Sequence, residues 1–145
     1  SVRVAARPGA APTADRVPLD DLLPSVDVLS LHCPLTDATH GLIGARELAL
    51  MQPHAFLTNT ARGGLVDEQA LADALRAGRI GGAGFDVLTR EPPREGNPLL
   101  APDIPNLVMT PHSAWGSCEA RARMVAQLAA NIRGFTAGES VRRVV

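Results

Sequence analysis

Three short segments of the chain place side chains capable of acid, base or ionic chemistry beside glycine or proline. They are residues 59–67 with Arg62, residues 84–93 with Asp86 and Glu91, and residues 110–115 with His112. A histidine can donate or accept a proton, a carboxylate can orient a histidine and raise its pKa, and an arginine can clamp an α-keto acid. Together these groups suit the reduction of a carbonyl.

Each of these residues also has an explanation that involves no ligand. Arg62 can lie on the surface or cap a helix, Glu91 can be a solvated loop acid, and Asp86 can cap a turn. His112 can be a structural histidine. A site is favoured by the combination, because complementary groups follow successive predicted strands in a chain with only 4 histidines.

The order of apolar runs and helical patterns predicts an α/β fold with a parallel sheet. The expected strands are residues 2–5, 26–31, 55–59, 82–87 and 107–109. The expected helices are residues 19–23, 45–51, 67–77 and about 117–135, and residues 7–12 and 91–98 are expected loops. Open parallel sheets bind ligands at the carboxyl ends of their strands, so the three segments should gather at that edge.

Local signals set the ends of the helix expected over residues 67–77. Asp67 can cap its start, and Gly78 supplies its stop. Between them Leu71, Ala74 and Leu75 form an apolar stripe with helical spacing. This helix should therefore bury one face.

Composition excludes several classes of protein. The 145 residues fit one domain, and a formal net charge of −1 favours neither nucleic acid nor an anionic membrane. Cys33 and Cys118 form no metal-like spacing and no disulfide framework, and no apolar run is long enough for a membrane span. We expect a cytoplasmic protein without a metal site.

The three segments resemble the D-2-hydroxyacid dehydrogenases. The resemblance is carried by residues 59–68 (NTARGGLVDE), Gly84-Phe85-Asp86-Val87 with Glu91-Pro92, and Pro111-His112 with Ala114-Trp115. It implies that Arg62 binds the carboxylate and carbonyl of the substrate, that His112 is the general acid for reduction, and that Glu91 pairs with His112. It also implies a Rossmann-type, doubly wound parallel sheet that binds NAD or NADP.

The same resemblance assigns residues to the dinucleotide. Asp86 would face the carboxamide side of the nicotinamide, Thr60 and Ala61 would line the cofactor, and Ala114 would lie beside it. A further loop, residues 31–36 with Cys33 and Pro34, resembles the family's loop against the adenosine half. That loop can equally be a strand ending at a proline turn, which needs no ligand.

A tryptophan at position 115, directly after His112-Ser113-Ala114, resembles the glycerate dehydrogenase and hydroxypyruvate reductase branch of the family. This resemblance implies hydroxypyruvate or glyoxylate as the 2-keto acid substrate and a D-2-hydroxy acid as the product. An aromatic residue at a helix start can also simply pack in a core. Phosphoglycerate dehydrogenase remains a possible activity. Formate dehydrogenase is disfavoured, because it resembles the family but has a glutamine at the position of Glu91.

Two departures from the family pattern stand near the N-terminus. Where NAD-using members carry an acid at the end of the second strand, this chain has Ala6 followed by Arg7, which favours tolerance of NADP. No G-x-G-x-x-G precedes residues 2–5. We therefore expect residues 1–145 to be part of a dinucleotide-binding domain that lacks the first strand, the phosphate loop and the substrate domain.

Because the expected missing strand is central to the family's sheet, the chain alone should fold poorly and be inactive. The parent enzyme, by resemblance, would be a homodimer. Two other interpretations remain: a dinucleotide sensor like the transcriptional corepressors that resemble this family, and an inactive remnant.

Overall fold

The computed structural model describes residues 1–9, 13 and 15–141. The chain forms two compact units, Ser1–Pro111 and His112–Val145. Among the described residues no helix is both long and apolar enough to cross a membrane.

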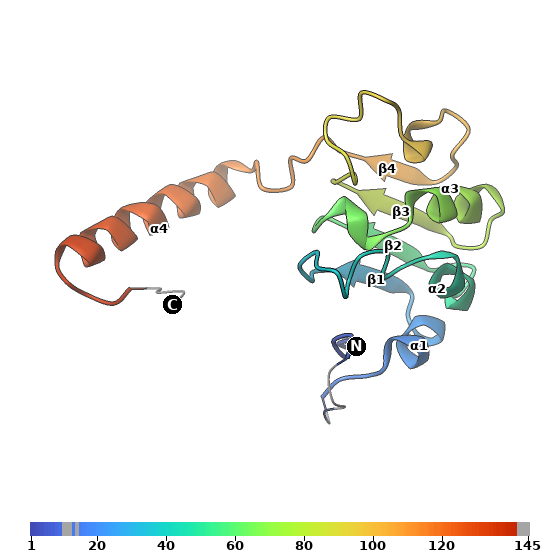
Figure 1. Ribbon diagram of the computed structural model, residues 1–145, viewed down its shortest axis with the longest axis horizontal. Coiled ribbons are helices and arrows are strands. Elements are labelled where there is room, and N and C mark those ends of the chain that lie inside the picture. The colour runs from blue at the N-terminus through green and yellow to red at the C-terminus, as the bar shows by residue number, and fades with distance from the viewer. Residues whose placement is uncertain (10–12, 14, 142–145) are drawn as a thin grey trace. The chain divides into compact units, whose positions relative to one another are not determined.

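The first unit is built on a four-stranded parallel sheet (Figure 1). Its strands are β1 (Val28–Leu31), β2 (Phe56–Asn59), β3 (Gly82–Phe85) and β4 (Leu107–Met109), and they lie in chain order. Leu31, Asn59 and Phe85 are aligned across β1, β2 and β3. The carboxyl ends of these strands therefore meet at one edge, as the sequence predicts.

Short helices connect the strands and cover one face of the sheet (Figure 1). They are α1 (Leu19–Leu22), α2 (Ala45–Leu50) and α3 (Glu68–Arg76), with 3-10 turns η1 (Leu23–Ser25), η2 (Gly63–Leu65) and η3 (Pro98–Leu100). Leu57 is fully buried beneath them, whereas its neighbour Phe56 on the other face is 50% exposed. This alternation, expected for successive strand residues, shows that the core of the unit lies between the sheet and these helices.

The local signals predicted for α3 are confirmed. The Asp67 carboxylate accepts a hydrogen bond from the backbone N–H of Ala70 at 3.0 Å. Gly78 follows the helix with φ of +62°, a conformation that glycine adopts without strain. Leu71 and Leu75 are buried in the core.

An exposed ion pair ties α3 to the loop that follows η3. The Arg76 guanidinium donates to both carboxylate oxygens of Asp103, at 2.7 and 3.1 Å. Hydrogen bonding from Arg76 holds the pKa of the Asp103 carboxyl below its ordinary value. The segment between β3 and η3, which carries Glu91, is attached to α3 by other contacts.

The prediction of a strand over residues 2–5 is wrong. Only Ala5 pairs, in an isolated parallel bridge with Val17, while Val2 and Val4 are 93% and 47% exposed. An apolar run becomes a strand only when neighbouring backbone extends the pairing, and here the pairing stops at one bridge. Of the loop expected at residues 7–12, residues 10–12 lie outside the described residues.

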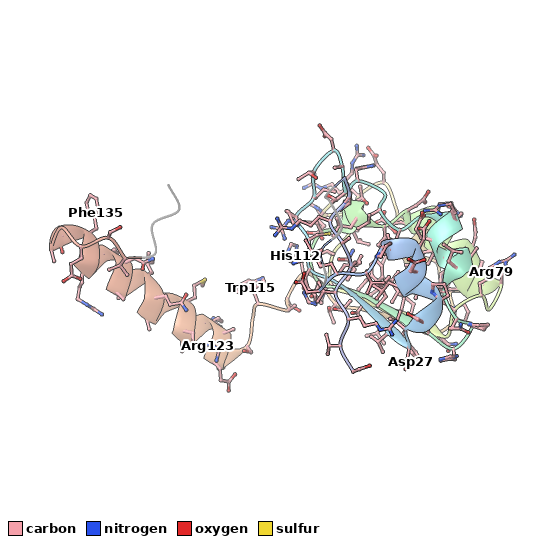
Figure 2. The ribbon with its side chains drawn as sticks, turned by 90° about the horizontal axis from the view of Figure 1, so that it is seen from below. Asp27, Arg79, His112, Trp115, Arg123 and Phe135 are labelled. Carbon is pink, nitrogen blue, oxygen red and sulfur yellow. The ribbon has the colours of Figure 1, made fainter. Side chains whose placement is uncertain are left out.

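The second unit is dominated by α4 (Cys118–Thr136). Its start is capped by the Ser117 hydroxyl, which accepts from the N–H of Ala120 at 3.1 Å. Phe135 projects near its carboxyl end and is 84% exposed (Figure 2). The bounds of α4 agree to within one residue with the helix predicted over residues 117–135.

At the carboxyl edge of the sheet, the loop after β2 lies against its neighbours on both sides. On one side, the Gly41 N–H donates to the Gly64 carbonyl at 2.8 Å. On the other, Gly63 lies directly on main chain, because a Cβ built on it would fall 2.0 Å from the Leu88 carbonyl carbon and 2.2 Å from the Thr89 nitrogen. Only glycine permits this approach.

We predict that Leu57→Ala destabilises the folded protein by about 2–5 kcal/mol, because it removes fully buried methyl groups and leaves a cavity. Leu100→Ala is the matched control, since Leu100 is 48% exposed. Urea denaturation measures both. Equal losses in the two variants would contradict this position of the core.

We predict that Gly63→Ala forces the loops after β2 and β3 apart and costs about 1–3 kcal/mol or more of stability, because the new methyl meets rigid main chain. Gly84→Ala is the control, since the nearest atom to its added Cβ would be a methyl carbon of Thr58 at 3.9 Å. Urea denaturation and amide hydrogen exchange at Leu88 and Thr89 measure the effect. An unchanged Gly63→Ala protein would refute the contact.

Candidate functional site

Arg62 stands in the loop after β2, on a main chain held by a buried asparagine. Asn59 is fully buried. Its amide nitrogen donates to the Arg62 carbonyl at 2.9 Å, and its amide oxygen accepts from the Ala61 N–H at 3.1 Å. The Arg62 side chain is exposed and donates to the Ala61 carbonyl at 2.6 Å. A fixed backbone thus carries an accessible guanidinium.

Thr60 and Ala61 occupy the same turn. Thr60 is exposed and Ala61 is half-buried. Both side chains are small. Their contact with a dinucleotide stays a prediction.

Asp86 directly follows β3 and is 3% exposed. Its N–H extends the pairing with β2 by donating to the Asn59 carbonyl at 3.0 Å. The Thr110 hydroxyl, from the residue after β4, donates to its carboxylate. Asp86 is thus a buried acceptor between strand ends rather than a simple turn cap.

Glu91 lies further along the loop after β3 and is exposed. Its carboxylate accepts from the Leu88 N–H at 2.7 Å. Because Leu88 is the residue that contacts Gly63, the loops of Arg62 and Glu91 meet through their main chains. The structure therefore brings together the edge positions of Arg62, Asp86 and Glu91 within the first unit.

His112 and Ala114 belong to the second unit, in the segment before α4, and both are exposed. His112 has φ of +51°, in the left-handed region. The indole N–H of Trp115 donates to the His112 carbonyl at 2.9 Å, which fixes this turn locally (Figure 2). Trp115 is 58% exposed and so is no core residue of the described structure.

The remaining predicted residues lie on the side of β1. Cys33 is half-buried and packs against the core, and Pro34 is exposed. Their loop is shaped by Thr39, whose hydroxyl donates to the Pro34 carbonyl at 2.7 Å. Arg7 is exposed and comes shortly after the Ala5–Val17 bridge.

Sequence reasoning missed three residues that hold this edge together: Asn59, Thr110 and Glu68. Asn59 and Thr110 stand inside the motifs quoted above. The partner of Asn59 is defined by the turn geometry, whereas Thr110 bonds to Asp86 across neighbouring strand ends. Glu68 joins segments far apart in the chain, so no local pattern reveals it. Among the described residues, no group of three or more His, Cys, Asp or Glu could hold a metal ion.

Comparison with known proteins identifies related sequences. The chain is 53% identical over 123 residues to glycerate dehydrogenase of Methylorubrum extorquens, covering 85% of this chain and 39% of that protein. It is 46% identical over 123 residues to glyoxylate reductase of Korarchaeum cryptofilum, covering 85% and 36% respectively. The chain thus spans less than half the length of these relatives.

Solved structures share the fold. An acyclic imino acid reductase in complex with NADPH and D-Arg has a TM-score of 0.73 and 38% identity, covering 90% of this chain and 41% of that one. D-lactate dehydrogenase with NAD+ from Lactobacillus jensenii has a TM-score of 0.76 and 32% identity, covering 90% and 42%.

The family match spans most of the first unit and runs into the second. Residues 3–114 match the family described as "D-isomer specific 2-hydroxyacid dehydrogenase, NAD binding domain", a range that takes in the motifs around Arg62, Glu91 and His112. The α/β class and the parallel sheet agree with that domain. The chain belongs to the D-isomer specific 2-hydroxyacid dehydrogenase family, as an NAD-binding domain of it.

Proposed function

We propose that the chain is the dinucleotide-binding part of an enzyme that interconverts a small 2-keto acid, hydroxypyruvate or glyoxylate, and the D-2-hydroxy acid. The observation that carries the proposal is the contact between the loops of Arg62 and Glu91 at the carboxyl edge of β2 and β3. In a 2-hydroxyacid dehydrogenase, an arginine and a glutamate at this edge suit a carboxylate substrate and an acid catalyst.

The residues of the first unit fit a nicotinamide dinucleotide. Asp86 offers a buried carboxylate at the end of β3, which can accept a hydrogen bond from a carboxamide. The small side chains of Thr60 and Ala61 at the end of β2 leave room for a planar ring. Cys33, Pro34 and Arg7 would contact the adenosine half, and Ala114 would line the nicotinamide side.

The proposed mechanism assigns one task to each polar group. The dinucleotide, when bound, supplies the hydride for reduction and accepts it for oxidation. Arg62 binds the substrate carboxylate and fixes which face of the carbonyl is presented. Protonated His112 donates its proton to the carbonyl oxygen, and neutral His112 accepts it in reverse. Glu91 would pair with His112, as the family resemblance implies.

The substrate assignment rests on the relatives and on Trp115. The two relatives described above are named for glycerate and glyoxylate, which are small 2-hydroxy and 2-keto acids. Trp115 stands beside His112 in the turn and would limit the size of the group attached to the carbonyl. The doubly wound topology and homodimeric assembly of the whole enzyme stay predictions.

We predict that His112→Asn, Arg62→Gln and Glu91→Gln each impair hydroxypyruvate reduction, with a loss of kcat on the order of 10²–10⁴ for His112→Asn. The assay uses this chain joined to the amino-terminal part of the 53% identical glycerate dehydrogenase. Reduction should slow as the pH rises and oxidation as it falls.

The matched controls are His54→Asn, Arg90→Gln and Glu95→Gln, which change exposed residues of the same types. His54 pairs with Asp27 before β1, away from the carboxyl edge, and Arg90 pairs with Glu95. Full activity of His112→Asn, or a shared pH profile for both directions, would refute the mechanism. Tight dinucleotide binding without turnover in the parent chimera would instead indicate a sensor.

We predict that Arg7→Ser lowers kcat/KM for NADPH by about tenfold and leaves that for NADH nearly unchanged, because an exposed arginine can pair with a 2′-phosphate. The same chimera and steady-state kinetics with each dinucleotide measure the change. Arg3→Ser is the control, since Arg3 is also exposed but donates to Ser25. Equal losses with both dinucleotides would overturn this role.

A further inference from the structure

Glu68, the first residue of α3, accepts hydrogen bonds from both ends of the segment that carries Glu91. One carboxylate oxygen accepts from the Thr89 N–H at 2.7 Å. The other accepts from the side-chain amide of Asn97, also at 2.7 Å. The carboxylate therefore pins residues 89 and 97 to the same helix end, with Glu91 between them.

Asn97 uses its second amide atom in the same network. Its oxygen accepts from the Leu99 N–H at 2.9 Å and so caps η3. In addition, α3 packs against η3, and Leu99 is buried at 2% exposure. The far end of the segment is thus anchored to the core through Asn97.

The near end of the segment lies on Gly63. Thr89, which donates to Glu68, and Leu88, which donates to Glu91, form the stretch of main chain that Gly63 contacts. Glu68 thereby ties the start of the Glu91 segment to α3 at the point where that segment contacts the turn after Arg62. All of these contacts lie within the first unit.

We infer that Glu68 is a positioning residue of the reaction, which acts by holding the Glu91 segment through Thr89 and Asn97. This inference rests on the proposed function, because it needs Glu91 to act in catalysis. With the Asn97 amide opposite it, a carboxylate fits this position: both of its oxygens accept, whereas a glutamine presents one acceptor and one donor.

The test is a reciprocal exchange of the two side chains. In Glu68→Gln alone, the new amide donor faces the amide donor of Asn97. In Asn97→Asp alone, two carboxylates lie where a hydrogen bond of 2.7 Å stood. In the double variant, the new amide at position 68 donates to the new carboxylate at position 97. That carboxylate can still accept from Leu99, and Thr89 keeps its acceptor.

We predict that each single variant lowers kcat for hydroxypyruvate reduction by about tenfold, since small misplacement of a catalytic group is costly, and that the double variant recovers most of it. Dinucleotide affinity and the KM for hydroxypyruvate should change little. The assay uses the chimera described above. Glu47→Gln is the matched control, because Glu47 is also a first-turn glutamate that accepts a backbone N–H, that of Gly44.

Combining Glu68→Gln with Glu91→Gln distinguishes failure of the positioning role from failure of the proposed function. If Glu68 acts through Glu91, adding Glu68→Gln to Glu91→Gln causes no further loss of kcat. Additive losses, no recovery in the exchange variant, or unchanged kcat in Glu68→Gln would each overturn the positioning role. If Glu91→Gln leaves kcat unchanged, the proposed function on which the positioning role rests is overturned instead.

Discussion

The carboxyl edge of this domain depends on a contact between two main chains, where Gly63 lies against Leu88 and Thr89. Any side chain at residue 63 would separate the loops that follow β2 and β3, and with them Arg62 and Glu91. Parallel pairing brings the two strand ends together, but it does not fix the loops beyond them. The glycine allows the loops to touch, and the carboxylates of Glu68 and Glu91 then accept from the N–H groups of Thr89 and Leu88.

Sequence alone predicts the features whose causes are local. The cap at Asp67, the stop at Gly78 and the strand bounds of β4 are read correctly because short-range preferences decide them. The placement of Arg62 and Glu91 at one edge also follows, because successive parallel strands share their direction.

What the sequence does not reveal is pairing between distant segments. Residues 2–5 have the composition of a strand, yet pairing is limited to Ala5 with Val17. The hydrogen bond from Asn97 to Glu68 joins residues 29 positions apart, and in the sequence either residue resembles an ordinary polar surface group. The same holds for the hydrogen bond from Thr110 to Asp86, which crosses from one strand end to the next.

At this edge, a buried and hydrogen-bonded asparagine holds a main chain that carries exposed polar side chains. Asn59 is fully buried and satisfies two main-chain groups of the turn, while the guanidinium of Arg62 above it is exposed. Glu91 is likewise exposed on a segment whose ends are held by α3. Ordering the main chain during folding lowers the entropy that binding of the proposed substrate must still remove, because only side-chain rotamers then remain to be fixed. Fixed loops with accessible side chains are therefore suited to binding a small acid that offers few contacts of its own.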